Sequence, residues 1–141
     1  MDPTLYLFDG YNMLHAGPYD EPRELVDALA SFVAVRGARG VVVFDGVGRD
    51  AEHGPLSVRY APHADTLLER LAAEHRSTEP VMLVTSDSTV AAAAGQVAKL
   101  SSQTFFRDHE PPRHREEQPQ GLAGKLDEET RARLERLRRG E

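Results

Sequence analysis

Three short runs of large apolar residues constrain the fold of this chain more than any other feature. They occupy residues 5–8, 41–44 and 81–84, and none shows the alternation of apolar and polar residues typical of a half-exposed strand. Strands that are apolar on both sides are typical of the buried centre of a parallel sheet. Between them, apolar residues recur at helical spacing over 21–36 and again after Asp65. This order predicts an α/β fold, a three-layer sandwich with a mainly parallel central sheet of about five strands.

Shorter segments complete the predicted sheet. Residues 56–61 alternate and predict a more exposed strand, and residues 97–100 predict an edge strand. A short helix capped by Ser101 or Ser102 is expected to follow. The polar residues 46–55 are predicted to be a loop.

Length and composition suit one domain with a tail. The chain has 141 residues, and the predicted folded domain covers 1–109. A proline-rich, charged linker is expected over 110–121, and a charged C-terminal helix, docked on the domain, over 122–141. The chain has no cysteine, so neither disulfides nor thiolate metal sites are available. We found no apolar stretch of about 20 residues and no signal peptide, so we expect a cytoplasmic protein with no membrane partner.

The distribution of charge says more than the net charge of −6. Residues 110–141 carry eight acidic and eight basic side chains, whereas residues 1–109 carry fifteen acidic and nine basic ones. Proteins that hold nucleic acid on a broad basic face have the opposite balance. Any contact of this domain with nucleic acid is therefore expected to be local, or assisted by a bound metal ion and a larger partner.

Four aspartates lie at or shortly after the ends of predicted strands: Asp9, Asp45, Asp65 and Asp87. In a parallel sheet the carboxyl ends of the strands share one edge, where ligands bind in open α/β folds. Two unit charges 4 Å apart repel by about 4 kcal/mol at an effective dielectric constant near 20. A fold is not expected to gather such groups unless a cation lies among them. Oxygen ligands without cysteine indicate Mg²⁺ or Mn²⁺.

Each aspartate also has a purely structural explanation. An aspartate at a junction between strand and helix is commonly an N-cap or a turn former. For Asp65 and Asp87 taken singly, the N-cap is the better explanation. Asp9 is harder to explain in this way, because a turn rather than a helix is expected directly behind it. Asp45 is ambiguous.

Three motifs, in their order along the chain, resemble those of NYN domains. They are Asp9-Gly-Tyr-Asn12, Ala64-Asp65-Thr-Leu-Leu-Glu69-Arg and Val84-Thr-Ser-Asp87. Within these domains the sequence is similar to the YacP-like bacterial branch, which is related to PIN-domain nucleases, and the final segment 126–140 also resembles that branch. The resemblance implies a PIN-like Rossmannoid fold and a divalent-metal-dependent endoribonuclease, a hydrolase of RNA decay.

The resemblance also implies roles for individual residues. The metal-binding and catalytic carboxylates would be Asp9, Asp65 and Asp87. Asn12 would hold Asp9 or the phosphate in place. Glu69 lies one helical turn after Asp65 and could bind the metal through water. Asp45 would support the other ligands or serve a weaker second metal ion.

Candidate substrate contacts are few: Tyr11, Ser86, Arg49 and Arg59. Tyr11 could stack on a base, an interaction worth about 1–3 kcal/mol, or could pack on the first helix instead. Arg49 and Arg59 flank the loop over the predicted strand ends. The expected partner is RNA, either free or on the ribosome.

A different class of function remains open, that of a non-catalytic NYN module that binds RNA or protein. The full set of carboxylates argues against it, since a pure binding module would be expected to lose some of this costly charge. A metal-dependent phosphatase or a nuclease acting on DNA is a third reading. The sequence contains no feature that would read a 2′-hydroxyl.

Overall fold

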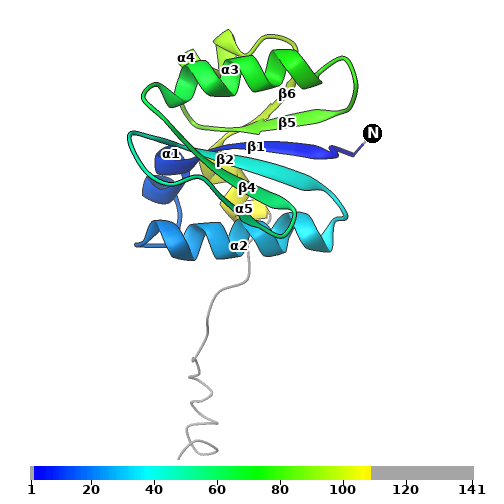
Figure 1. Cartoon of the computed structure of the whole chain (residues 1–141). Coiled ribbons are helices and arrows are strands. Elements are labelled where there is room, and N and C mark those ends of the chain that lie inside the picture. The colour runs from blue at the N-terminus through cyan, green and yellow to red at the C-terminus, as the bar shows by residue number, and fades with distance from the viewer. Residues whose placement is uncertain (1, 109–141) are drawn as a thin grey trace, which may run out of the picture.

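A six-stranded sheet forms the middle layer of the computed structural model, which describes residues 2–108 (Figure 1). The strands are β1 (Leu5–Asp9), β2 (Arg39–Asp45), β3 (Ala51–His53), β4 (Leu56–Ala61), β5 (Val81–Val84) and β6 (Ala98–Leu100). Their spatial order is β3-β4-β2-β1-β5-β6, and every neighbouring pair is parallel except β3 with β4. The mainly parallel α/β sandwich predicted from the sequence is thus confirmed.

Helices cover both faces of the sheet. They are α1 (Gly10–Ala16), α2 (Pro22–Val35), α3 (Ala64–His75), α4 (Ser88–Ala93) and α5 (Ser102–Asp108). Helices α2 and α5 lie on one face, and α3 and α4 lie on the other (Figure 1). Helix α2 begins with a capping box between Glu21 and Glu24, and the Ser101 hydroxyl accepts a hydrogen bond from Thr104 N–H at the start of α5.

The two helical layers explain why the central strands are apolar without alternation. In β1, Tyr6 and Phe8 enter the core beneath α2, while Leu5 and Leu7 enter the core beneath α3. Strands β2 and β5 divide their side chains in the same way. Because both faces of each strand are buried, a polar residue has no place along it until the strand ends. The first polar side chain after such a run therefore marks the end of the sheet at which the parallel strands have their carboxyl ends.

Two elements differ from the sequence prediction. The predicted loop 46–55 contains β3, which forms a hairpin with β4 through Gly54 at a φ of 62° and gives the sheet a sixth strand. Helix α1 begins at Gly10, directly behind Asp9, where a turn was predicted. That helix has seven residues, of which only Gly10 and Met13 are buried, so it is too short to show a helical period.

Some expectations fall on residues outside 2–108. The linker predicted at 110–121 and the charged helix predicted at 122–141 lie beyond the described part of the chain. Within the described part, none of the helices has the length and apolar character needed to cross a membrane.

Gly10 packs against the buried ring of Phe44. A Cβ atom on Gly10 would lie 2.5 Å from Cδ1 of that ring. The ring is held by Tyr11 and Tyr60, whose centroids lie 4.9 Å and 5.5 Å away. We therefore expect Gly10→Ala to lower the free energy of unfolding by about 1–3 kcal/mol in urea denaturation. In a Phe44→Leu background the same substitution should cost less, and an equal cost in both backgrounds would contradict this account.

Candidate functional site at the carboxyl ends of the strands

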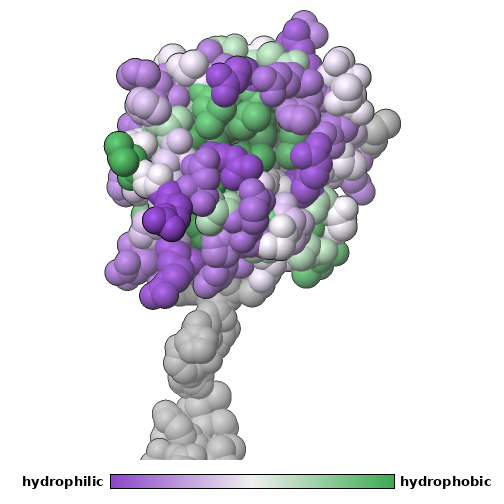
Figure 2. Space-filling model, viewed as in Figure 1, coloured by the Kyte–Doolittle hydropathy of each residue, from purple (hydrophilic) through white to green (hydrophobic). Residues whose placement is uncertain are grey.

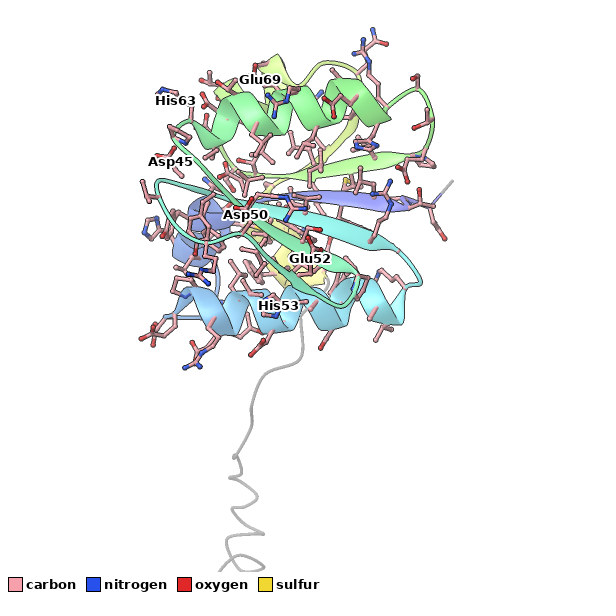
Figure 3. The ribbon with its side chains drawn as sticks, viewed as in Figure 1. Asp45, Asp50, Glu52, His53, His63 and Glu69 are labelled. Atoms are coloured by element: carbon pink, nitrogen blue, oxygen red, sulfur yellow. The ribbon has the colours of Figure 1, made fainter. Side chains whose placement is uncertain are left out.

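The sheet brings the ends of β1 and β2 to one edge. Asp9 is the last residue of β1 and pairs with Val43, two residues before Asp45 ends β2. Helices α3 and α4, which carry or follow Asp65 and Asp87, also begin at this edge, because each comes after a parallel strand that ends there. The four aspartates therefore share one end of the sheet, where Figure 3 shows Asp45.

Asp9 is the electrostatic centre of this group. Its side chain is half-buried. Burial raises the pKa of Asp9, and the charges of Asp87, Asp65 and Asp45 raise it further, in that order, against a lowering effect of the hydrogen bond from Thr85. The charges of these three aspartates thus act on Asp9. Asp45 has the smallest effect of the three.

Thr85 links the two aspartates that the resemblance places first and last. The Thr85 hydroxyl donates a hydrogen bond to Asp9 Oδ2 at 2.8 Å. The Thr85 hydroxyl oxygen also accepts a hydrogen bond from the Asp87 backbone N–H at 3.0 Å. The side chain is 5% exposed. The sequence alone predicted no role for this residue. The signal was present, because a threonine two residues before an aspartate can accept its backbone N–H in a tight turn.

The N-cap explanation holds for Asp87 and not for Asp65. Asp87 Oδ1 accepts hydrogen bonds from the N–H groups of Thr89 and Val90, at 2.9 Å and 3.4 Å, at the start of α4. The N-cap of α3 is His63, and Asp65 lies in the first turn, where its Oδ1 meets Thr66 N–H at 2.9 Å.

Of the remaining two aspartates, Asp45 bonds to the start of a helix and Asp9 does not. Asp45 Oδ1 accepts the Ala64 N–H at 3.1 Å and so fastens the end of β2 to the start of α3. Asp9 occupies the N-cap position of α1, yet its side chain makes no capping hydrogen bond. A helix does follow Asp9, contrary to the prediction, but capping does not explain the aspartate.

Asn12 holds neighbouring elements together and makes no hydrogen bond to Asp9 in the described structure. Its Oδ1 accepts hydrogen bonds from Ser86 N–H at 2.8 Å and from the Ser102 hydroxyl at 2.6 Å. The Ser86 hydroxyl in turn donates to Gln103 Oε1 and accepts from Ser102 N–H. The roles of Ser102 and Gln103 were not predicted, because they depend on α5 lying beside α1 and no local pattern in the sequence shows this.

The other predicted contacts are more scattered. Glu69 is drawn above α3, on the side away from the sheet (Figure 3). Arg59 forms an ion pair with Glu52 across the β3–β4 hairpin at 3.0 Å, and this pair would have to break before Arg59 could bind a phosphate.

Two predicted contacts remain open to a ligand. Arg49 is exposed in the loop that follows β2. The Tyr11 ring packs edge-on against Phe44 and is 36% exposed, so it has both a structural contact and a free face.

Comparison with known families shows which family the chain resembles. The model of the YacP-like NYN domain matches residues 6–139, which include all four aspartates. The chain belongs to the YacP-like NYN domain family. Its structure is similar to that of a mutant of Rae1 (YacP) from Bacillus subtilis, with a TM-score of 0.62 and 28% sequence identity over 78% of this chain and 76% of that one. No curated protein matches the chain.

The donor set of this NYN domain suits a divalent cation, although its arrangement is open. Carboxylate oxygens are the ligands that Mg²⁺ prefers, and a cation would relieve the repulsion that raises the pKa of Asp9. Between residues 2 and 108, however, no three acidic or histidine side chains are grouped so that they could hold a metal ion. Asp45, Asp65 and Asp87 each direct Oδ1 to a backbone N–H.

Thr85 offers a test of how this NYN domain positions its aspartates. Thr85→Val removes the donor to Asp9 and leaves the Asp87 N–H without its acceptor. We expect the free energy of unfolding, measured by urea denaturation, to fall by about 1–3 kcal/mol. Thr85→Ser keeps the hydroxyl and should retain most of the stability. If Thr85→Ser and Thr85→Val are equally destabilised, the hydroxyl has no such role.

Proposed function

We propose that this chain is a divalent-metal-dependent endoribonuclease. The observation that carries the proposal is the environment of Asp9, whose pKa is raised by burial and by the charges of Asp87, Asp65 and Asp45. A half-buried carboxylate among three others is unfavourable for the folded protein on its own. A bound cation would offset that cost, and cation binding would therefore explain why four carboxylates lie at one end of the sheet.

Membership of the YacP-like NYN family supports the reaction class, because NYN domains belong to the PIN-like nuclease superfamily. The chemistry that a bound Mg²⁺ or Mn²⁺ ion supplies in such sites is activation of a water molecule and neutralisation of charge on the leaving oxygen. RNA is therefore the proposed substrate. The proposal includes action in the cytoplasm and on RNA that is bound to the ribosome.

The residues of this chain have distinct roles in the proposed site. Asp9 is the central ligand, and Asp87 and Asp65 flank it, in the order of their effect on Asp9. Capping uses only Oδ1 of Asp87, so its Oδ2 accepts no hydrogen bond from residues 2–108 and is available to a metal ion. Thr85 and Asn12 fix the turn that carries Asp87. Asp45 and Glu69 lie further out, and we assign them at most a supporting or water-mediated contact.

One observation favours the alternative of a non-catalytic module that binds RNA or protein. The acidic side chains of residues 2–108 do not form a group ready to hold a metal ion. In that case the four carboxylates would only cap and connect helices. Hydrogen bonds to the starts of α3 and α4 account for Asp45 and Asp87, but no such bond accounts for Asp9, so we favour the nuclease.

Cleavage of labelled single-stranded RNA by the purified full-length protein tests the proposal. The assay should include Mg²⁺, Mn²⁺ or EDTA, and the RNA should be supplied both free and on translating ribosomes. We expect cleavage only with a metal ion, and none from Asp87→Asn. Asp27→Asn is the matched control, because Asp27 is exposed on α2, which covers the face of the sheet opposite α3 and α4. Cleavage that persists in EDTA would exclude the metal-dependent mechanism.

A further inference from the structure

A groove opens between β4 and α3, beside the acidic strand ends. Its volume is about 330 Å³, and its lining includes Tyr60, Ala61, His63, Thr66, Leu67 and Arg70. Figure 2 shows an apolar area below α3 that is bordered by hydrophilic side chains. The groove therefore combines apolar walls with a polar rim on the surface of an otherwise charged domain.

We propose that this groove binds one nucleobase of the RNA, next to the phosphate that lies at the aspartates. The inference rests on the proposed function. It adds a subsite that binds the base of one nucleotide at a fixed position relative to the cleaved phosphodiester bond. Three features of the groove support it: its position, its chemistry and its size.

The position follows from the backbone. Ala61 ends β4 opposite Asp45, and its carbonyl accepts the Gly46 N–H at 2.7 Å. Asp45 also holds the N–H of Ala64, and Asp65 follows Ala64 directly. The residues between β4 and α3 thus form both the end wall of the groove and one side of the acidic group. Figure 3 shows His63 and Asp45 at the same end of the sheet.

The chemistry of the groove suits a flat heterocycle that carries a phosphate. Ala61 and Leu67 provide apolar contact for the faces of a ring, and the Thr66 hydroxyl can hydrogen-bond to its edge. Arg70 lies at the rim with 65% of its side chain exposed, and its Nε is 3.8 Å from Glu74, so this weak pair can release the guanidinium to a phosphate. His63 is exposed on the side nearer the aspartates.

The size of the groove suits one base. Pockets for small ligands measure about 300–1,000 Å³, so this groove is at the lower limit and has room for one base. Apolar side chains of the chain itself could also fill the groove. The C-terminal segment, with Leu134 and Leu137, is the rival occupant that an experiment must separate.

Amide NMR spectra of the full-length protein in EDTA test this inference without relying on cleavage. The probes are the four nucleoside 5′-monophosphates, with ribose 5-phosphate as the probe that lacks a base. We expect the nucleotides to shift the amides of Ala61, His63, Thr66 and Leu67, and to bind at least about fivefold more tightly than ribose 5-phosphate, the lower limit for base stacking.

Two substitutions make the test specific. Thr66→Leu fills the groove from an exposed helical position and should weaken nucleotide binding at least about fivefold. Ser31→Leu is the matched control, an exposed hydroxyl on α2 across the sheet, and should leave binding unchanged. Equal binding of ribose 5-phosphate, shifts elsewhere, or no effect of Thr66→Leu would overturn the inference.

The rival occupant gives a different result. If Leu134→Asp with Leu137→Asp shifts the groove amides and the nucleotides do not, the groove belongs to the C-terminal segment and the inference is wrong. If nucleotides bind in the groove but no RNA is cleaved, the proposed function fails and the base site remains. If RNA is cleaved and no base binds there, only the base site fails.

Discussion

Replacing Asp9 by asparagine is expected to lower metal-dependent RNA cleavage by more than about 100-fold. Groups that merely orient metal ligands account for about 10–100-fold, and Asp9 is placed here as the central ligand itself. The Thr85 hydroxyl can still donate to the asparagine oxygen, so the turn should keep its geometry. Initial rates of cleavage at saturating Mg²⁺ measure the effect, with Asp27→Asn as the control for loss of one negative charge.

The same substitution should stabilise the protein in the absence of metal. Burial, and then the neighbouring aspartates, raise the pKa of Asp9 in the folded state. The folded state therefore keeps its proton to a higher pH than the unfolded state does. The stability that this provides is complete below the ordinary aspartate pKa and is lost as the pH rises through the raised one.

Asp9→Asn lacks this loss, so its free energy of unfolding in EDTA should exceed that of the wild type at neutral pH. The difference should disappear in acid. Urea denaturation at several pH values measures it, and added Mg²⁺ should stabilise only the wild type. A variant that is less stable than the wild type at neutral pH and equally inactive would mean that Asp9 is structural.

Replacing Phe105 by alanine is expected to have the largest effect on stability, a loss of about 3–5 kcal/mol in the free energy of unfolding. The ring is fully buried, with its centroid 4.8 Å from that of Phe32 and 5.8 Å from that of Phe8. For a domain of this size the melting temperature should fall by more than about 12 °C.

The Phe105 substitution should also impair the site. Helix α5 supplies Ser102 and Gln103, which hold Asn12 and Ser86 beside the turn of Asp87. Phe106→Ala, next along the helix and only partly buried, is the matched control and should cost less. Calorimetric melting compares the two. Equal losses would show that α5 does not hold its place through the core.

The fold was largely readable from the sequence, because its main signals are local. Apolar runs without alternation ended at or shortly before aspartates. Because β1, β2 and β5 are buried on both faces, each such ending marks the carboxyl end of the sheet. Helix α1 and strand β3 escaped prediction for a physical reason. Seven residues with two buried positions, and three residues in a hairpin, are too few to show a period.

The candidate site divides along the same line. The aspartates could be found because each follows its own strand. The partners of those aspartates could not, because Thr85 bonds to Asp9 across 76 residues and Ser102 bonds to Asn12 across 90. The capping of α4 by Asp87 was predicted from the few residues around it. That Asp9 does not cap α1 depends on the orientation of its side chain, which the sequence does not show.

The central claim is that the aspartates at the strand ends hold a divalent cation. A titration with Mn²⁺, followed as paramagnetic broadening of amide NMR signals, tests it most directly. We predict broadening centred on Asp9, Gly10, Asp65 and Asp87 at low Mn²⁺, reversal by excess Mg²⁺, and loss of the effect in Asp9→Asn. Broadening that is absent from these residues, or that is unchanged in Asp9→Asn, would contradict the claim.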